Sequence, residues 1–138
     1  MLVFFKERLV LFSVPKTGTT ALQTALRDRA DIVIGYPPEL KHAPLYRYNQ
    51  YLKPMLKEVC EAEMETMAVI REPLDWLGSW YRYRRRSYML GRPNNTHAID
   101  FEEFVRSYMK DPRPEFANVG SQSRFLRPEI DQDPVTHL

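Results

Sequence analysis

Short apolar runs alternate with helical patterns along most of the chain. Three of these runs are bounded by charged, proline or glycine residues, as is typical of buried strands: Leu9–Val14, Ile32–Ile34 and Thr66–Ile70. Between and after the runs, apolar residues recur at every third or fourth position, which predicts helices with one buried face. Helices are expected over residues 19–29, 52–60 and 73–88. A further helix is expected to begin at Asp100 and to end at Pro112, and a weaker one to cover 115–125.

This order of elements predicts an α/β fold. Strands that alternate with helices imply a parallel sheet whose helices make right-handed crossovers. Three parallel strands make a small sheet, and Val135–Leu138 has the pattern of another strand beginning. We therefore expect one domain over residues 1–138, and we expect the native protein or its relatives to continue beyond it.

Composition and charge narrow the classes of function. The 138 residues are 43% hydrophobic and 28% charged, with 20 Lys and Arg against 18 Asp and Glu. Such a near-balanced chain is typical of a soluble globular domain and not of a general nucleic-acid binder. No apolar run approaches the roughly 18 residues that a membrane-spanning helix needs. The single cysteine, Cys60, and the lack of a secretory signal favour a cytoplasmic protein.

The sharpest chemical feature lies between the first expected strand and the first expected helix. The segment reads, in order, Pro15, Lys16, Thr17, Gly18, Thr19 and Thr20. A turn of this kind before a helix presents backbone N–H groups to an anion, and Lys16 adds a positive charge. The lysine precedes the glycine, so the spacing is not that of a Walker A loop for ATP or GTP with Mg²⁺. The alternative is a turn in which glycine and threonine serve only to cap the helix.

A second group of residues follows the third expected strand. Arg71 comes directly after the apolar run, and Ser79 follows it by eight positions on the next expected helix. In a β-α-β-α-β unit the first and third strands can be neighbours, and parallel strands present ligands at their carboxyl ends. Lys16 and Arg71 would then face one crevice. Two separated cationic and hydroxyl groups indicate a ligand with two separated phosphate groups.

Together these segments resemble the sulfotransferase superfamily that uses 3′-phosphoadenosine 5′-phosphosulfate (PAPS). The segment from Pro15 to Thr20 is similar to that family's 5′-phosphosulfate loop, and Arg71 with Ser79 is similar to its 3′-phosphate motif. Glu72 stands where the family usually has Asp. The resemblance covers roughly residues 8–126 and is closest to bacterial sulfotransferase-like proteins and carbohydrate sulfotransferases. It implies a three-layer α/β/α fold of the P-loop type with a small parallel sheet.

The resemblance also implies a reaction, the transfer of a sulfuryl group from PAPS to a hydroxyl or amine of a carbohydrate or other small-molecule acceptor. Lys16 would stabilise the leaving phosphate, and the backbone N–H groups of residues 17–20 would hold the 5′-phosphate. Arg71 and Ser79 would hold the 3′-phosphate. PAPS is then the co-substrate, and no metal, nucleic acid or membrane is expected. The alternative is a truncated or degenerate relative that binds the nucleotide without turnover.

The base that accepts the acceptor's proton has more than one candidate. His42 follows the second expected strand, and an imidazole titrates near neutral pH. Glu39 is the second candidate, since some relatives use a carboxylate. His42 can also be read as an ordinary surface-loop histidine.

A dense basic run closes the helix that follows Arg71. It comprises Arg82, Arg84, Arg85 and Arg86. The run suits an anionic acceptor or the phosphates of the donor. A solvated helix face is the commoner interpretation of such a run.

Overall fold

A computed structural model describes residues 1–129, which divide into two compact units. The first unit comprises Met1–Val69 with the described residues from Gln122 onward, and the second comprises Ile70–Ser121. Strands and helices both occur, so the expected α/β class is confirmed. The single sulfotransferase-like domain over residues 1–138 stays a prediction, and the expected strand at Val135–Leu138 lies outside the described residues.

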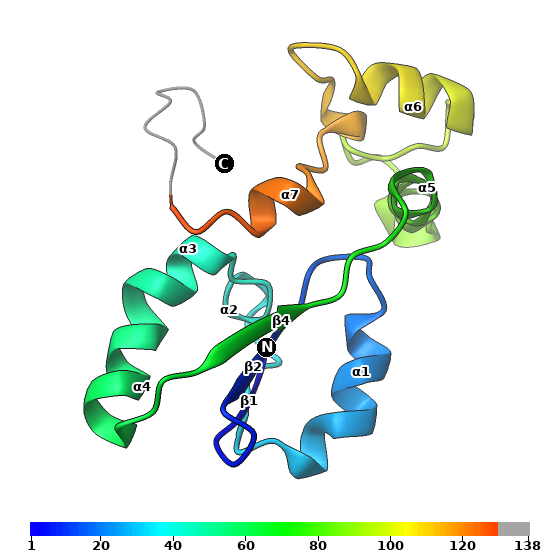
Figure 1. The fold of residues 1–138 in the computed structure, drawn as a ribbon. Helices are drawn as coiled ribbons and strands as arrows, with labels where there is room; N and C mark the ends of the chain where they lie inside the picture. Colours follow the sequence, from blue (N-terminus) through cyan, green and yellow to red (C-terminus); the bar gives the residue numbers. More distant parts are fainter. Residues whose placement is uncertain (130–138) are drawn as a thin grey trace. The chain divides into compact units, whose positions relative to one another are not determined.

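The first unit is built on a small mixed sheet with the strand order β3-β1-β2-β4 (Figure 1). Its strands are β1 (Leu2–Phe4), β2 (Leu9–Phe12), β3 (Ile32–Val33) and β4 (Glu65–Ala68). β2 and β4 are parallel neighbours, which confirms that the first and third expected strands lie side by side. β1 lies antiparallel to both β2 and β3, so the expectation of an all-parallel sheet was wrong.

β1 is the strand that the apolar pattern did not predict. It has only three residues, and it joins β2 through a tight turn in which the Arg8 amide donates to the Phe5 carbonyl at 3.2 Å. Arg8 takes a left-handed conformation, with φ of 51°. A connection this short can join only antiparallel strands, because a parallel crossover needs a dozen or so residues. The turn therefore places β1 between β2 and β3 and makes the sheet mixed.

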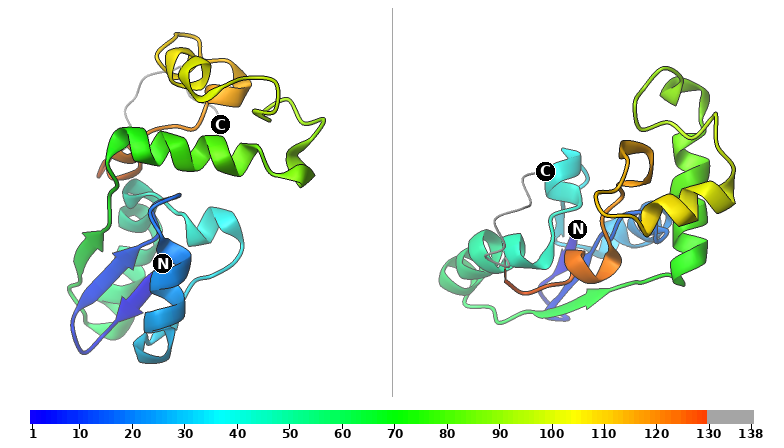
Figure 2. Two further views of the ribbon diagram at one scale, coloured as in Figure 1. Left: turned by 90° about the vertical axis from the view of Figure 1, so that its right-hand side faces the viewer. Right: turned by 90° about the horizontal axis from the view of Figure 1, so that it is seen from above.

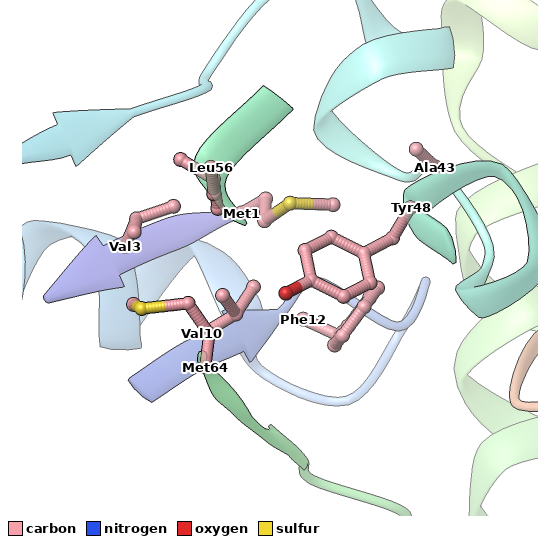
Figure 3. Packing of buried hydrophobic residues seen from close by; sticks show 8 residues of the cluster. All are labelled: Met1, Val3, Val10, Phe12, Ala43, Tyr48, Leu56 and Met64. Atoms are coloured by element: carbon pink, nitrogen blue, oxygen red, sulfur yellow. The ribbon is translucent and has the colours of Figure 1, made fainter. Parts of the chain in front are cut away.

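Helices cover both faces of this sheet, because alternate residues of β1 and β2 point to opposite sides (Figure 1). On one face Leu2, Phe4 and Leu11 pack with Leu26 at the end of α1 (Thr19–Leu26). On the other face Val3, Val10 and Phe12 pack with Tyr48 and with Leu56 of α4 (Lys53–Cys60), as Figure 3 shows. The two clusters hold the sheet between helical layers.

Short helical segments link the longer elements of the first unit. They are a 3₁₀ turn at Arg27–Arg29, α2 (Pro38–Lys41), α3 (Leu45–Arg47), a π-helical turn at Tyr48–Leu52 and α7 (Gln122–Phe125). The expected helices over residues 19–29 and 52–60 are confirmed by α1 with its 3₁₀ turn and by α4. The continuous helix expected over 115–125 was wrong, because extended backbone at Asn118 and the left-handed Gly120 (φ 70°) divide it.

The second unit packs two helices around its own aromatic core. Its elements are α5 (Pro73–Arg84), a 3₁₀ turn at Ser87–Met89, α6 (Phe101–Tyr108) and a 3₁₀ turn at Glu115–Ala117; Figure 2 gives two further views of the ribbon. Trp76 and Leu77 of α5 pack with the fully buried Phe104 of α6. Asp100 caps α6, since its carboxylate accepts from the Glu103 amide at 2.8 Å, as the sequence predicted. Within residues 1–129 no helix is long and apolar enough to cross a membrane.

Candidate functional site

The segment from Pro15 to Thr20 forms a tight turn between β2 and α1. Lys16 and Gly18 are both left-handed, with φ of 67° and 82°, and Gly18 is the N-cap residue of α1. The Thr17 hydroxyl donates to the Val14 carbonyl at 2.9 Å, which braces the turn against the end of the strand. Within residues 1–129 no side-chain hydrogen bond caps the start of α1, and the first backbone N–H groups of a helix are the groups that bind an anion.

The conformation of Lys16 is costly for a residue with a side chain. A non-glycine residue pays roughly 1–2 kcal/mol in the left-handed region. Such strain is found where a turn has to hold a particular shape, and functional sites are common among such turns. Thr19 is buried and Thr20 is exposed, so only the second of these two threonines, both expected to contact a phosphate, has a solvent-exposed side chain.

His42 is fixed to the strand that precedes this turn. It follows α2, and its Nδ1 lies 2.6 Å from the carbonyl oxygen of Ser13. A carbonyl oxygen only accepts hydrogen bonds, so Nδ1 carries the proton and donates, and the neutral ring keeps its lone pair on Nε2. This is the tautomer that a general base needs, with one nitrogen anchored and the other able to take up a proton.

Burial keeps this imidazole neutral near pH 7. Desolvation lowers the pKa of His42 below its usual 6.5, although the bond to Ser13 opposes that change. The positive charges of Lys41 and of the Met1 amino group lower the pKa of His42 further. Glu39, the other candidate base, lies exposed on α2. Between the two candidates, the local geometry favours His42.

Ser13 joins the N-terminus, α1 and His42 through hydrogen bonds. Its hydroxyl accepts from the Met1 amino group at 2.9 Å and from the Gln23 amide of α1 at 3.3 Å, while its carbonyl holds His42. Burial, aided by the charge of Lys41, lowers the pKa of the Met1 amino group to about 5. The sequence analysis did not single out Ser13. The one available signal was a polar residue near the end of an otherwise apolar run.

The second group of expected site residues lies at the start of α5. Arg71, two residues before α5, donates from Nε to Asp75 in the first turn of the helix at 2.5 Å, and the two residues form an ion pair. Glu72 is the N-cap residue of α5, and its two carboxylate oxygens accept from the amides of Leu74 (3.1 Å) and Asp75 (2.7 Å). Glu72 therefore serves as the helix cap at the position where the resembled family usually has Asp.

Ser79 lies half-buried on α5, one helical turn beyond Asp75. Residues spaced by four positions share one face of a helix, so Asp75 and Ser79 lie on one face of α5. Asp75 was not among the residues expected at this site.

The arginine run of α5 serves more than one purpose. Arg84 is buried, and its guanidinium donates to the carbonyls of Glu115 (2.7 Å) and Asn118 (2.9 Å). Arg85 and Arg86 are exposed and stack on the rings of Tyr81 and Tyr83. Arg84 is therefore a structural residue, and the expectation that the whole run is either a ligand surface or a solvated face was wrong for this one member.

The expected site residues are divided between the two units. The Lys16 turn and His42 belong to the first unit, joined through Ser13, while Arg71 and Ser79 belong to the second. A crevice shared by Lys16 and Arg71 stays a prediction. The strands that precede the two clusters, β2 and β4, are paired in parallel, as that prediction requires.

No family model, no curated protein and no solved structure matches this chain. The resemblance to the sulfotransferases therefore stands on two short segments, their order, and the elements that carry them. The first lies between a strand and a helix, and the second lies at the start of a helix.

Proposed function

We propose that the protein is a PAPS-dependent sulfotransferase that transfers a sulfuryl group to a hydroxyl or amine of a small-molecule or carbohydrate acceptor. The observation that carries this proposal is the bond between His42 Nδ1 and the Ser13 carbonyl at 2.6 Å. It sets a neutral imidazole beside the strand that leads into an anion-binding turn.

In the proposed reaction His42 Nε2 takes the proton of the acceptor hydroxyl or amine as this group attacks sulfur. The new bond to sulfur forms while the bond between sulfur and the 5′-phosphate oxygen breaks, in line with the attack. Negative charge grows on that phosphate oxygen as 3′-phosphoadenosine 5′-phosphate leaves. Lys16 and the N–H groups at the start of α1 neutralise it.

Arg71 and Ser79 are assigned to the 3′-phosphate of the donor. A guanidinium can hold a phosphate through two parallel hydrogen bonds, and the Ser79 hydroxyl supplies a further donor. The parallel β2–β4 pair and the helices on both faces of the sheet support a three-layer sulfotransferase fold of the P-loop type. We propose a cytoplasmic location for this enzyme.

The experiment that tests the proposal measures thermal unfolding with 3′-phosphoadenosine 5′-phosphate and, separately, with ATP and Mg²⁺. At one hundred times its Kd a ligand stabilises the fold by about 2.7 kcal/mol. In a chain of this size the midpoint then rises by roughly 5–10 °C. We expect this rise with the bisphosphate only, and its loss in Lys16→Ala and Arg71→Ala. Lys6→Ala and Arg106→Ala remove the same charges at exposed positions and serve as matched controls.

Formation of the bisphosphate from PAPS with an acceptor completes the test. Binding of the bisphosphate without turnover on any acceptor would leave a nucleotide-binding relative that has lost the reaction. An equal rise with ATP and Mg²⁺ would instead indicate a different nucleotide enzyme. No rise with either ligand would overturn the proposed donor site.

A further inference from the structure

Charged residues precede and follow Ser79 along one face of α5. Asp75, Gly78, Ser79 and Arg82 follow one stripe of this helix, and Arg71, two residues before α5, is joined to the stripe by its ion pair with Asp75. Within this stripe a carboxylate stands between two guanidinium-bearing residues. An arrangement with two cations and one hydroxyl is the chemistry that binds a phosphate or sulfate group.

Asp75 already supplies an anion to this stripe. Its carboxylate holds Arg71 at 2.5 Å, and that hydrogen bond is the main reason why the pKa of Asp75 lies below its usual range. The positive charge of Arg82 lowers the pKa of Asp75 in addition. The side chains of Arg71 and Asp75 are 33% and 54% exposed, so a ligand can reach the pair. Exposed ion pairs of this kind are weak, and a stronger anion displaces the carboxylate.

Arg82 reaches back along the helix because residue 78 is glycine. A β-carbon placed on Gly78 would lie 3.1 Å from Arg82 Nη1, so the guanidinium occupies the space that a side chain would take. Gly78 lies between Asp75 and Arg82 on the same stripe. Within the described residues Arg82 forms no ion pair, and its charge remains to serve an incoming anion.

We propose that Arg82 is a third contact for the phosphate held by Arg71 and Ser79, and that Asp75 is the internal competitor for this site. The inference rests on the proposed function, because it identifies the bound group with the 3′-phosphate of the donor. When the phosphate binds, Arg71 exchanges the carboxylate for the ligand. When the bisphosphate product leaves, the carboxylate returns, so Asp75 weakens product binding and speeds release.

Inorganic sulfate tests the site without reference to any nucleotide. The side-chain Nε–H signals of Arg71 and Arg82 are followed by NMR as sulfate is added to the full chain. We expect both signals to move with one common Kd. Because an exposed ion pair contributes up to about 1 kcal/mol, Asp75→Asn should tighten binding by about two- to fivefold. Glu102→Gln is the matched control, since Glu102 forms the same kind of pair with Arg106 on α6 at 2.6 Å.

A second arm separates the role of Arg82 from a structural one. Arg82→Gln should weaken binding of 3′-AMP about two- to tenfold, the value of one charge-assisted contact at an accessible site. Binding of 5′-AMP, which uses the Lys16 turn, should stay unchanged. Arg85→Gln removes the same charge from the next turn of the chain and should change neither. The combined variant Asp75→Asn with Arg71→Gln should lose the gain that Asp75→Asn gives alone.

The possible outcomes distinguish this inference from the proposed function. If sulfate moves both arginine signals and Asp75→Asn tightens binding, the site stands even where PAPS is not turned over. If PAPS is turned over while the Arg82 signal stays still, or while Asp75→Asn and Glu102→Gln behave alike, the inference is overturned. Equal loss of 3′-AMP binding in Arg82→Gln and Arg85→Gln would also overturn it.

Discussion

The turn that carries Lys16 and the start of α5 are both candidate phosphate sites, yet they are held in different ways. Around the turn, buried groups form the contacts: Ser13 is 3% exposed, its hydroxyl accepts from Met1 and from Gln23 of α1, and its carbonyl holds His42. At the start of α5 the contacts are exposed side-chain pairs, and the Asp75 side chain is 54% exposed.

This difference matches what each region is proposed to do. Chemistry at a reacting atom requires positions fixed to within a fraction of an ångström, which buried hydrogen bonds provide. Holding and releasing a phosphate far from the reacting bond requires contacts that exchange readily, which exposed ion pairs provide. Substitutions near His42 should therefore abolish turnover, while substitutions along α5 should change the affinity for the phosphate.

The largest expected effect is at His42. In His42→Asn the amide nitrogen can still donate to the Ser13 carbonyl, so the backbone arrangement survives while the base is lost. We expect kcat to fall by about 10²- to 10⁴-fold, the usual contribution of general-base catalysis. The thermal shift with 3′-phosphoadenosine 5′-phosphate should be unchanged.

Glu39→Gln is the control for this prediction, because it tests the other candidate base, which lies on α2 just before His42. Its turnover of PAPS should stay close to that of the wild type. If Glu39→Gln abolished turnover and His42→Asn did not, the roles assigned to the two residues would be reversed.

The next largest effect tests whether the two units are stabilised separately. Phe104 is fully buried in the core of the second unit, and its truncation to alanine should cost about 3–5 kcal/mol. Amide hydrogen exchange should then quicken across residues 70–121 and remain slow in β1 and β2. Phe101→Ala, at a 37% exposed position on the same helix, should have a much smaller effect. Equal loss of protection in both units would show that they unfold as one.

A third prediction concerns pH and the buried groups around Ser13. Because the pKa of His42 is lowered by burial, the unfolded chain binds more protons than the folded chain between that pKa and 6.5. The free energy of unfolding should therefore decrease as the pH falls through 6.5. The Met1 amino group, whose pKa falls from 8.0 to about 5, acts in the same direction from pH 8 downward.

Denaturant unfolding at a series of pH values separates these two contributions. His42→Asn removes only the histidine contribution, so the wild type should lose stability more steeply than this variant below pH 6.5. The two proteins should behave alike between pH 8 and pH 7, where the amino group of the unfolded chain takes up its proton in both. Equal slopes below pH 6.5 would mean that His42 does not take part in this linkage.

The sequence predicted the elements that carry the sites better than it predicted the sheet. The parallel pairing of β2 and β4 followed from the order of elements, because few topologies satisfy a strand–helix alternation. β1 was missed because three apolar residues fit many structures, and only their pairing with Leu9–Leu11 defines a strand. The prediction of a helix over 115–125 was wrong because the backbone of Gly120 is left-handed. The periodicity of apolar residues does not reveal such a conformation.

The same limit applies to the candidate sites. Lys16, Arg71 and Ser79 were found because side-chain chemistry and spacing are visible in the sequence. The partner of His42 was not, because a backbone carbonyl is present at every residue and only the fold selects the one at Ser13. The pairing of Asp75 with Arg71 was not predictable from helical spacing, because Arg71 precedes the helix. The position of the Arg82 guanidinium depends on the space that the missing side chain of Gly78 leaves.

The smallest expected effect, at Gly78, separates stability from binding. Gly78 lies inside α5, where alanine is favoured over glycine by up to about 1 kcal/mol. A new β-carbon would lie 3.7 Å from the nearest atom of Phe101, which is an ordinary van der Waals contact. Gly78→Ala should therefore raise the melting midpoint by a few degrees. The new β-carbon would lie 3.1 Å from Arg82 Nη1, so the guanidinium has to move and sulfate binding should weaken about twofold. Gly91→Ala is the contrasting variant, because φ of 76° strains any side chain there and the midpoint should fall. If Gly78→Ala is stabilised but binds sulfate as tightly as the wild type, the anion does not use the space above Gly78. That result would contradict the role proposed for Arg82 and would leave the description of α5 unchanged.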